Sequence, residues 1–160
     1  DSAQDAYMKY LINFVLPPDT VDNILTKMLP RTGITEGDLN RQLYMTQEQI
    51  LELHNRGHLI GAHSHRHIPL HRIENNITFD IGTNIEVLSQ TIGTRPKWIS
   101  YPHGTKQTLP IAPSHFCERF GFRVGLTMEP GWNLPSSPPS RILRIDQMDI
   151  NNFVDQKIPT

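Results

Sequence analysis

The chain has 160 residues, a length that suits one compact domain with a buried hydrophobic core. Fifteen Lys and Arg residues against sixteen Asp and Glu residues give a formal net charge of -1, without a basic run, so nucleic acid is not an expected partner. No apolar segment is long enough to cross a bilayer, and no membrane span is expected. The single cysteine, Cys117, is expected to be a small buried hydrophobic residue.

The first part of the chain predicts helices. The segments AYMKYLINFVL and DTVDNILTKML are separated by Pro17 and Pro18, which break a helix. Neither segment carries a catalytic motif. We therefore expect a helical insertion or lead-in over residues 1–44, followed by an α/β domain over 45–160.

Helices and short apolar strands alternate in the second part. TQEQILELHNRG (46–57) predicts a helix in which Thr46 is the N-cap and Gln49 completes a capping box. HLIGA (58–62) then predicts a buried strand that ends at His63. The further predicted elements are a helix in 82–93, a strand in 97–101, a helix in 113–121, a strand in 122–128, a strand in 141–146 and a helix near 149–156. Such alternation predicts an α/β fold with a mainly parallel sheet.

The stretch GAHSHRHIPL (61–70) holds three histidines at alternate positions. If the chain stays extended, His63, His65 and His67 point the same way; if it turns helical, only His63 and His67 share a face. Pro69 limits any long helix here. Under either reading, neutral imidazoles with this spacing suit Zn²⁺ or another first-row metal.

A second cluster, SYPHG (100–104), also lies at the carboxyl end of a predicted strand. Pro102 and Gly104 favour a tight turn, which can direct a backbone N–H toward a developing oxyanion. Ligands in parallel α/β folds collect at the carboxyl ends of strands, so the two clusters are expected to converge.

At these residues the sequence resembles the polysaccharide deacetylases, metal-dependent carbohydrate esterases. GHLIGAHSHRH is similar to the family motif G-H-x-I-G-x-H-[ST]-x-x-H, and ISYPHG is similar to its turn of an aromatic residue, proline, [YFH] and glycine. The resemblance covers roughly 45–146 and implies a distorted (β/α) barrel, which we expect to be incomplete at its N-terminus.

The resemblance also implies roles for individual residues. His63 and His67 correspond to the two metal-binding histidines, Ser64 holds the loop, and the backbone N–H of His103 stabilises the oxyanion. The expected metal is zinc, with cobalt or nickel as alternatives. In the family, a metal-activated water attacks an acetyl carbonyl and an aspartate acts as the general base.

Three features depart from the family pattern. No [ST]-F-D-D motif, the source of the base and the third ligand, precedes His63, so we expect it upstream of Asp1. The late L-x-H motif of the general acid is absent, and Ser100 replaces an arginine. ITFDIG (77–82) follows the histidines, and we interpret Asp80 as a helix cap or a surface charge rather than as a ligand.

Three further side chains are candidates for substrate contact. Tyr101 and Trp132 are expected to bind the sugar, although an isolated Trp is more often a packing residue. Arg144 is expected to supply the missing positive charge, with a surface ion pair to Asp146 or Asp149 as the alternative.

Three functions follow from these observations. The leading hypothesis is a hydrolase that removes acetyl groups from an N-acetylated sugar or polysaccharide, and the second is an inactive deacetylase-like domain that binds carbohydrate. The third is an unrelated metalloprotein with three histidine ligands, which requires His65. The sequence leaves oligomeric state and compartment open, whether cytoplasm or cell envelope.

Overall fold

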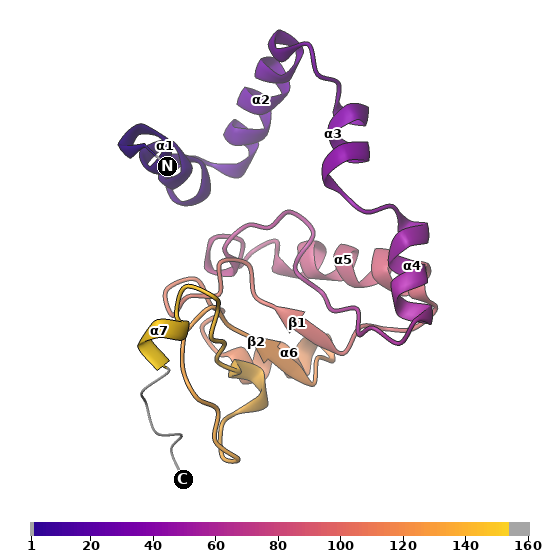
Figure 1. The fold of residues 1–160 in the computed structure, drawn as a ribbon, viewed down its shortest axis with the longest axis vertical. Coiled ribbons are helices and arrows are strands. Elements are labelled where there is room, and N and C mark those ends of the chain that lie inside the picture. Colours follow the sequence, from indigo (N-terminus) through magenta and orange to yellow (C-terminus); the bar gives the residue numbers. More distant parts are fainter. Residues whose placement is uncertain (1, 154–160) are drawn as a thin grey trace. The chain divides into compact units, whose positions relative to one another are not determined.

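The computed structural model describes residues 2–153, and the chain divides into two compact units with the boundary between Gly57 and His58 (Figure 1). From the sequence, this boundary was expected before Met45. The helix that follows Thr46 therefore belongs to the first unit rather than to the second. Each unit is described by itself.

The first unit is entirely helical over its described residues. Its elements are α1 (Ala3–Tyr10), a π-helical segment (Leu11–Val15), α2 (Pro18–Met28), a 3₁₀ turn (Leu29–Thr32), α3 (Glu36–Leu43) and α4 (Gln47–Asn55). The two helices predicted on either side of Pro17 are confirmed, as is the helix after Thr46. Helix α3 was not predicted from the sequence.

Local capping explains where these helices begin. In three of them an N-cap hydroxyl accepts the N3 backbone N–H while the N3 side chain accepts the N-cap N–H, which satisfies two amides that the helix itself leaves unpaired. The pairs are Ser2 with Asp5, Thr35 with Asp38, and Thr46 with Gln49. Burial is slight by comparison, since Val21 of α2 is 9% exposed whereas Leu43 and Tyr44 are 67% and 68% exposed.

The second unit contains the sheet. Its elements are a 3₁₀ turn (Leu70–Arg72), α5 (Ile77–Ile92), β1 (Trp98–Ser100), α6 (Pro113–Phe120), β2 (Val124–Leu126), a second 3₁₀ turn (Pro139–Arg141) and α7 (Ile150–Phe153). Helix α5 is longer than predicted because it begins at Ile77. The helix α6 lies where the sequence placed it. Of the last helix, predicted near 149–156, the part Ile150–Phe153 is confirmed, and residues 154–156 lie outside the described part of the chain.

The strands β1 and β2 lie side by side and run parallel, with Ile99 opposite Gly125 (Figure 1). Two further segments extend this sheet by a single bridge each, Ala62 beside Ile99 and Leu126 beside Ile142. The full strands predicted at 58–62 and 141–146 were therefore wrong, because each segment forms a single bridge to the sheet. In the later segment Arg144 also donates its backbone N–H to Glu129, beyond the end of β2.

Only one face of this sheet is buried. Ala62, Ile99 and Tyr101 point to the core and are at most 1% exposed, whereas Leu59 and Trp98 on the other face are 75% and 37% exposed. Side chains of α5 and α6 complete the core on the buried face, and Cys117 lies among them as predicted.

The expected barrel is not closed by the described residues, which form an open sheet of two strands and two bridges. The parallel α/β arrangement is nevertheless present, with four segments in consecutive order from Ala62 to Ile142. Across residues 2–153, none of the helices combines the length and the apolar character that crossing a membrane requires.

Candidate active site

The histidine loop begins where the sheet ends. Ala62 donates its N–H to Trp98 and accepts the N–H of Ser100, which places His63 beside the end of β1. The His63 Nδ1 atom then lies 2.7 Å from the carbonyl oxygen of Ser100. Because a carbonyl oxygen only accepts, Nδ1 must carry the proton, and the lone pair on Nε2 is left for a ligand. Metal-binding histidines are oriented in this way.

The loop holds two residues in a strained conformation. Ser64 has φ 64° and His67 has φ 53°, in the left-handed region that costs a residue other than glycine about 1–3 kcal/mol. The Ser64 Oγ atom accepts the backbone N–H of His67 at 2.9 Å. Ser64, which is 8% exposed, therefore holds the loop as the family resemblance implied.

Two side chains of α5, Asp80 and Asn84, hold the same loop by hydrogen bonds to its backbone. The two Asp80 carboxylate oxygens accept the backbone N–H groups of His65 and Arg66, at 3.0 and 3.1 Å. Asn84 Oδ1 accepts the N–H of His63 at 3.1 Å. Asp80 is 3% exposed, its carboxylate binds the loop, and the N-cap position of α5 is Asn76, so the interpretation of Asp80 as a helix cap or surface charge was wrong.

Three imidazole rings lie in series at this end of the sheet. The ring centroids of His63 and His67 are 4.7 Å apart, and those of His67 and His103 are 4.8 Å apart. Desolvation, followed by the neighbouring rings of His63 and His103, lowers the pKa of His67 below its usual value. Desolvation is also the main reason why the pKa of His103 is lowered. Low pKa values favour the neutral imidazole that a metal ion requires.

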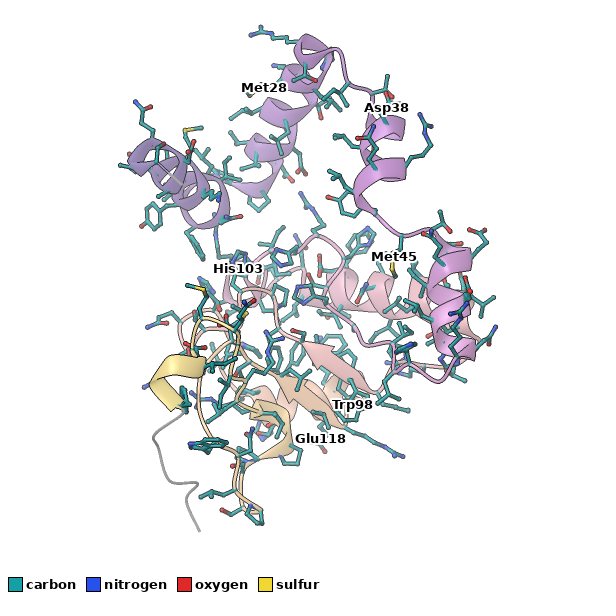
Figure 2. All side chains as sticks on the ribbon, viewed as in Figure 1. Met28, Asp38, Met45, Trp98, His103 and Glu118 are labelled. Atoms are coloured by element: carbon teal, nitrogen blue, oxygen red, sulfur yellow. The ribbon has the colours of Figure 1, made fainter. Side chains whose placement is uncertain are left out.

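The turn that carries His103 is fixed by contacts with the segment after β2. His103 and Gly104 have φ 60° and 50°. The Gly104 carbonyl accepts the N–H of Met128 at 2.8 Å, and a Cβ atom on Gly104 would lie 2.7 Å from that nitrogen. Only glycine fits here, as the tight turn predicted from Pro102 and Gly104 requires. The two predicted clusters do converge, and Figure 2 shows Trp98 and His103 toward opposite ends of β1.

Tyr101 does not face a substrate. It is 1% exposed, and its hydroxyl donates to the Ser140 carbonyl oxygen at 2.7 Å and lies 3.2 Å from the Cys117 Sγ atom. Burial is the main cause of the raised pKa of this phenol. The expectation that Tyr101 binds the sugar is therefore corrected, since its side chain packs in the core.

The next two candidates, Arg144 and Trp132, each contact other residues of the second unit. Arg144 Nε donates to the Thr127 carbonyl oxygen, one residue before the contact with Gly104. No ion pair joins Arg144 to Asp146 or Asp149 in the described part of the chain, so that alternative is not supported. The half-buried Trp132 packs edge-on against Phe153, with ring centroids 5.9 Å apart.

A groove of about 340 Å³ opens on the exposed face of the sheet beside His63. Its lining residues are Leu59, Gly61, Ala62, His63, Trp98, Ser100 and Leu126. Trp98 was missed by the sequence analysis, although its position next to Ile99 on a strand with one buried face indicates the open side. The groove thus brings an aromatic side chain and a candidate metal ligand to one surface.

The donor set fits a metal ion in part. Two adjacent imidazoles, one of them with its tautomer fixed, suit zinc, cobalt or nickel. Both oxygens of Asp80 already accept backbone N–H groups of the loop, and Asp80 does not form a group of three possible ligands with the histidines in the described residues. Within residues 2–153, no three or more histidine, cysteine, aspartate or glutamate side chains are arranged to hold a metal.

The family model of polysaccharide deacetylases matches residues 23–114. The match covers more than half of the chain and includes both predicted clusters, 61–70 and 100–104. The chain therefore belongs to the polysaccharide deacetylase family. This membership supports a deacetylase-type function on carbohydrate, as a hydrolase of carbon–nitrogen bonds. A search of curated proteins finds no match.

Proposed function

We propose that this protein is a metal-dependent hydrolase that removes acetyl groups from an N-acetylated sugar or polysaccharide, with His63 and His67 as metal ligands. The observation that carries the proposal is the hydrogen bond from His63 Nδ1 to the Ser100 carbonyl oxygen, because it fixes Nε2 as the ligand atom. The lowered pKa of His67 supports the same role. Zinc is the favoured metal, with cobalt or nickel as alternatives.

In this proposal the two loops have separate tasks. A bound zinc ion would act as a Lewis acid toward the acetyl carbonyl and would make water nucleophilic near neutral pH. The backbone N–H of His103 stabilises the developing oxyanion, from a turn that Gly104 and Met128 hold in place. Among the described residues we assign no general base, and Asp80 is already engaged by the histidine loop.

The substrate is assigned to the groove beside His63. Trp98 lines this groove and is 37% exposed, so its ring can pack against the apolar face of a sugar. Trp132 remains a second candidate, with one side of its ring against Phe153. Arg144 remains a candidate for a carboxylate or acetyl-sugar contact, and its Nε is held by Thr127.

The alternative is a carbohydrate-binding domain of the same family without catalytic activity. The absence of a third ligand around His63 and His67 in the described residues favours this alternative. It predicts that glycan binding survives the loss of both histidines, and that acetate is never released.

Acetate release from an oligomer of N-acetylglucosamine distinguishes the two functions. We expect the chain to release acetate when zinc or cobalt is supplied, and to lose this activity in EDTA and in the double variant His63→Ala, His67→Ala. Binding without release, unaffected by the double variant, would favour the alternative. If the chain neither binds the oligomer nor releases acetate, both proposals fail.

A further inference from the structure

We infer that Asp80 is a positioning residue for the candidate metal ligands: it fixes the backbone of the loop that carries His63 and His67. This inference rests on the proposed function, in which the loop carries the metal ligands. It concerns a residue that the sequence pattern set apart from the site. In the structure Asp80 hydrogen-bonds to this loop, although it lies 15 positions after His65 and 14 positions after Arg66 in the sequence.

The geometry of Asp80 is that of a two-point clamp. One carboxylate oxygen accepts the His65 N–H and the other accepts the Arg66 N–H, so two consecutive amides between the two ligands are held by one side chain. Hydrogen bonds from amides to a carboxylate are stronger than neutral ones. Asn84 lies one helical turn further along α5 and holds the His63 amide.

The helix that bears the clamp is itself fixed. Ile81 and Ile85 of α5 are 0% and 3% exposed and belong to the core of the unit. A buried carboxylate is tolerated only where its charge is compensated, and Asp80 sits in the first turn of α5, where the helix dipole favours negative charge. The core therefore sets the position of Asp80, and Asp80 sets the position of the loop.

The loop needs such support because Ser64 and His67 both have positive φ angles. A segment in this conformation persists only where its surroundings determine it. With Asp80 in place, the His63 and His67 rings stay 4.7 Å apart, close enough for both to reach one ion. Without it, we expect the loop to sample other conformations and the two ligands to separate.

The substitution Asp80→Asn tests the clamp. It keeps the shape of the side chain but replaces one acceptor oxygen by an NH₂ group, which faces a backbone N–H. We expect zinc affinity to fall roughly 10–100-fold, as for partners that orient metal ligands elsewhere. Titration against a chromophoric chelator measures this. Glu86→Gln on α5 is the matched control, since this exposed residue carries the same charge, and it should bind zinc like the unmodified chain.

Two further measurements separate positioning from a general loss of stability. Phe120→Leu shrinks a core side chain on α6, outside the helix that carries Asp80, and should lower the unfolding temperature without weakening zinc binding. In the metal-free chain, amide hydrogen exchange at His65 and Arg66 should be slow, and Asp80→Asn should make it fast. The exchange measurement tests the role of Asp80 in holding the loop even if the unmodified chain binds no zinc. Failure to bind zinc would overturn the proposed metal site but not the role of Asp80 in the loop.

Unchanged amide exchange in a folded Asp80→Asn variant would overturn the inference. So would a loss of zinc affinity in Phe120→Leu as large as that in Asp80→Asn, since the effect would then follow stability and not the clamp.

Discussion

Replacing either His63 or His67 by alanine should abolish zinc binding, whereas replacing His65 should leave it unchanged. Each of the first two substitutions removes one of two imidazoles whose centroids are 4.7 Å apart. The loss should exceed roughly 100-fold, because removing a ligand costs more than removing a residue that only orients one. Zinc titration of the three variants measures the effect, with circular dichroism to confirm that each is folded.

His65→Ala is the matched control in this series. It lies between the two ligands, its side chain is exposed, and its backbone N–H, which contacts Asp80, is retained in alanine. Loss of zinc binding in His65→Ala would instead support an unrelated metal site with three histidine ligands. Equal binding by all four proteins would place the metal elsewhere.

Gly125→Ala should unfold or strongly destabilise the second unit. An added Cβ atom would lie 2.2 Å from the Tyr101 hydroxyl oxygen and 2.6 Å from the Ser140 carbonyl oxygen. Tyr101 is 1% exposed and hydrogen-bonds to Ser140, so neither neighbour has room to move away. We expect the free energy of unfolding to fall by about 3 kcal/mol, the upper end of the usual cost of overpacking a core. Domains of this kind have only about 5–15 kcal/mol in total.

Gly82→Ala is the matched control for this prediction. Gly82 lies within α5 and has no atom within 4 Å of its added Cβ, so alanine should raise stability by roughly 0.5–1 kcal/mol. Urea unfolding followed by tryptophan fluorescence compares the two variants. A Gly125→Ala variant as stable as the unmodified chain would contradict the packing of Tyr101 against β2.

Much of the local structure could be predicted from the sequence because its causes are local. Thr46 and Gln49 form the expected capping box, and the helix α6 ends at Gly121, which has φ 71°. The strand β1 and its turn at Gly104 also lie where the pattern placed them. In each case a cap, a stop residue or a short apolar run decides the outcome within a few positions of the chain.

The role of Asp80 depends on contacts between distant segments. A sign of it was nevertheless present, because Asp80 follows Ile77 by three residues and so lies on the apolar face of α5. A carboxylate on a buried face requires partners. The burial of Tyr101 was also predictable, since it shares a strand face with Ile99. The identity of Asp80's partners, the amides of His65 and Arg66, was not available from any local pattern.

Strand length and barrel closure could not be predicted from the sequence, for a different reason. An apolar run such as HLIGA is compatible with a strand, but strand length depends on how many backbone groups find partners in the neighbouring segment. Here the N–H and the carbonyl of Ala62 both hydrogen-bond to β1, and the pairing of this segment with β1 does not extend beyond that bridge.

The most direct test of the proposed metal centre is nitrogen NMR of the histidine rings, recorded before and after zinc is added. We expect the Nε2 resonance of His63 and a ring nitrogen of His67 to shift on zinc binding, while His63 Nδ1 remains protonated against the Ser100 carbonyl. Zinc that leaves both rings unchanged, or that shifts only His65, would contradict the account.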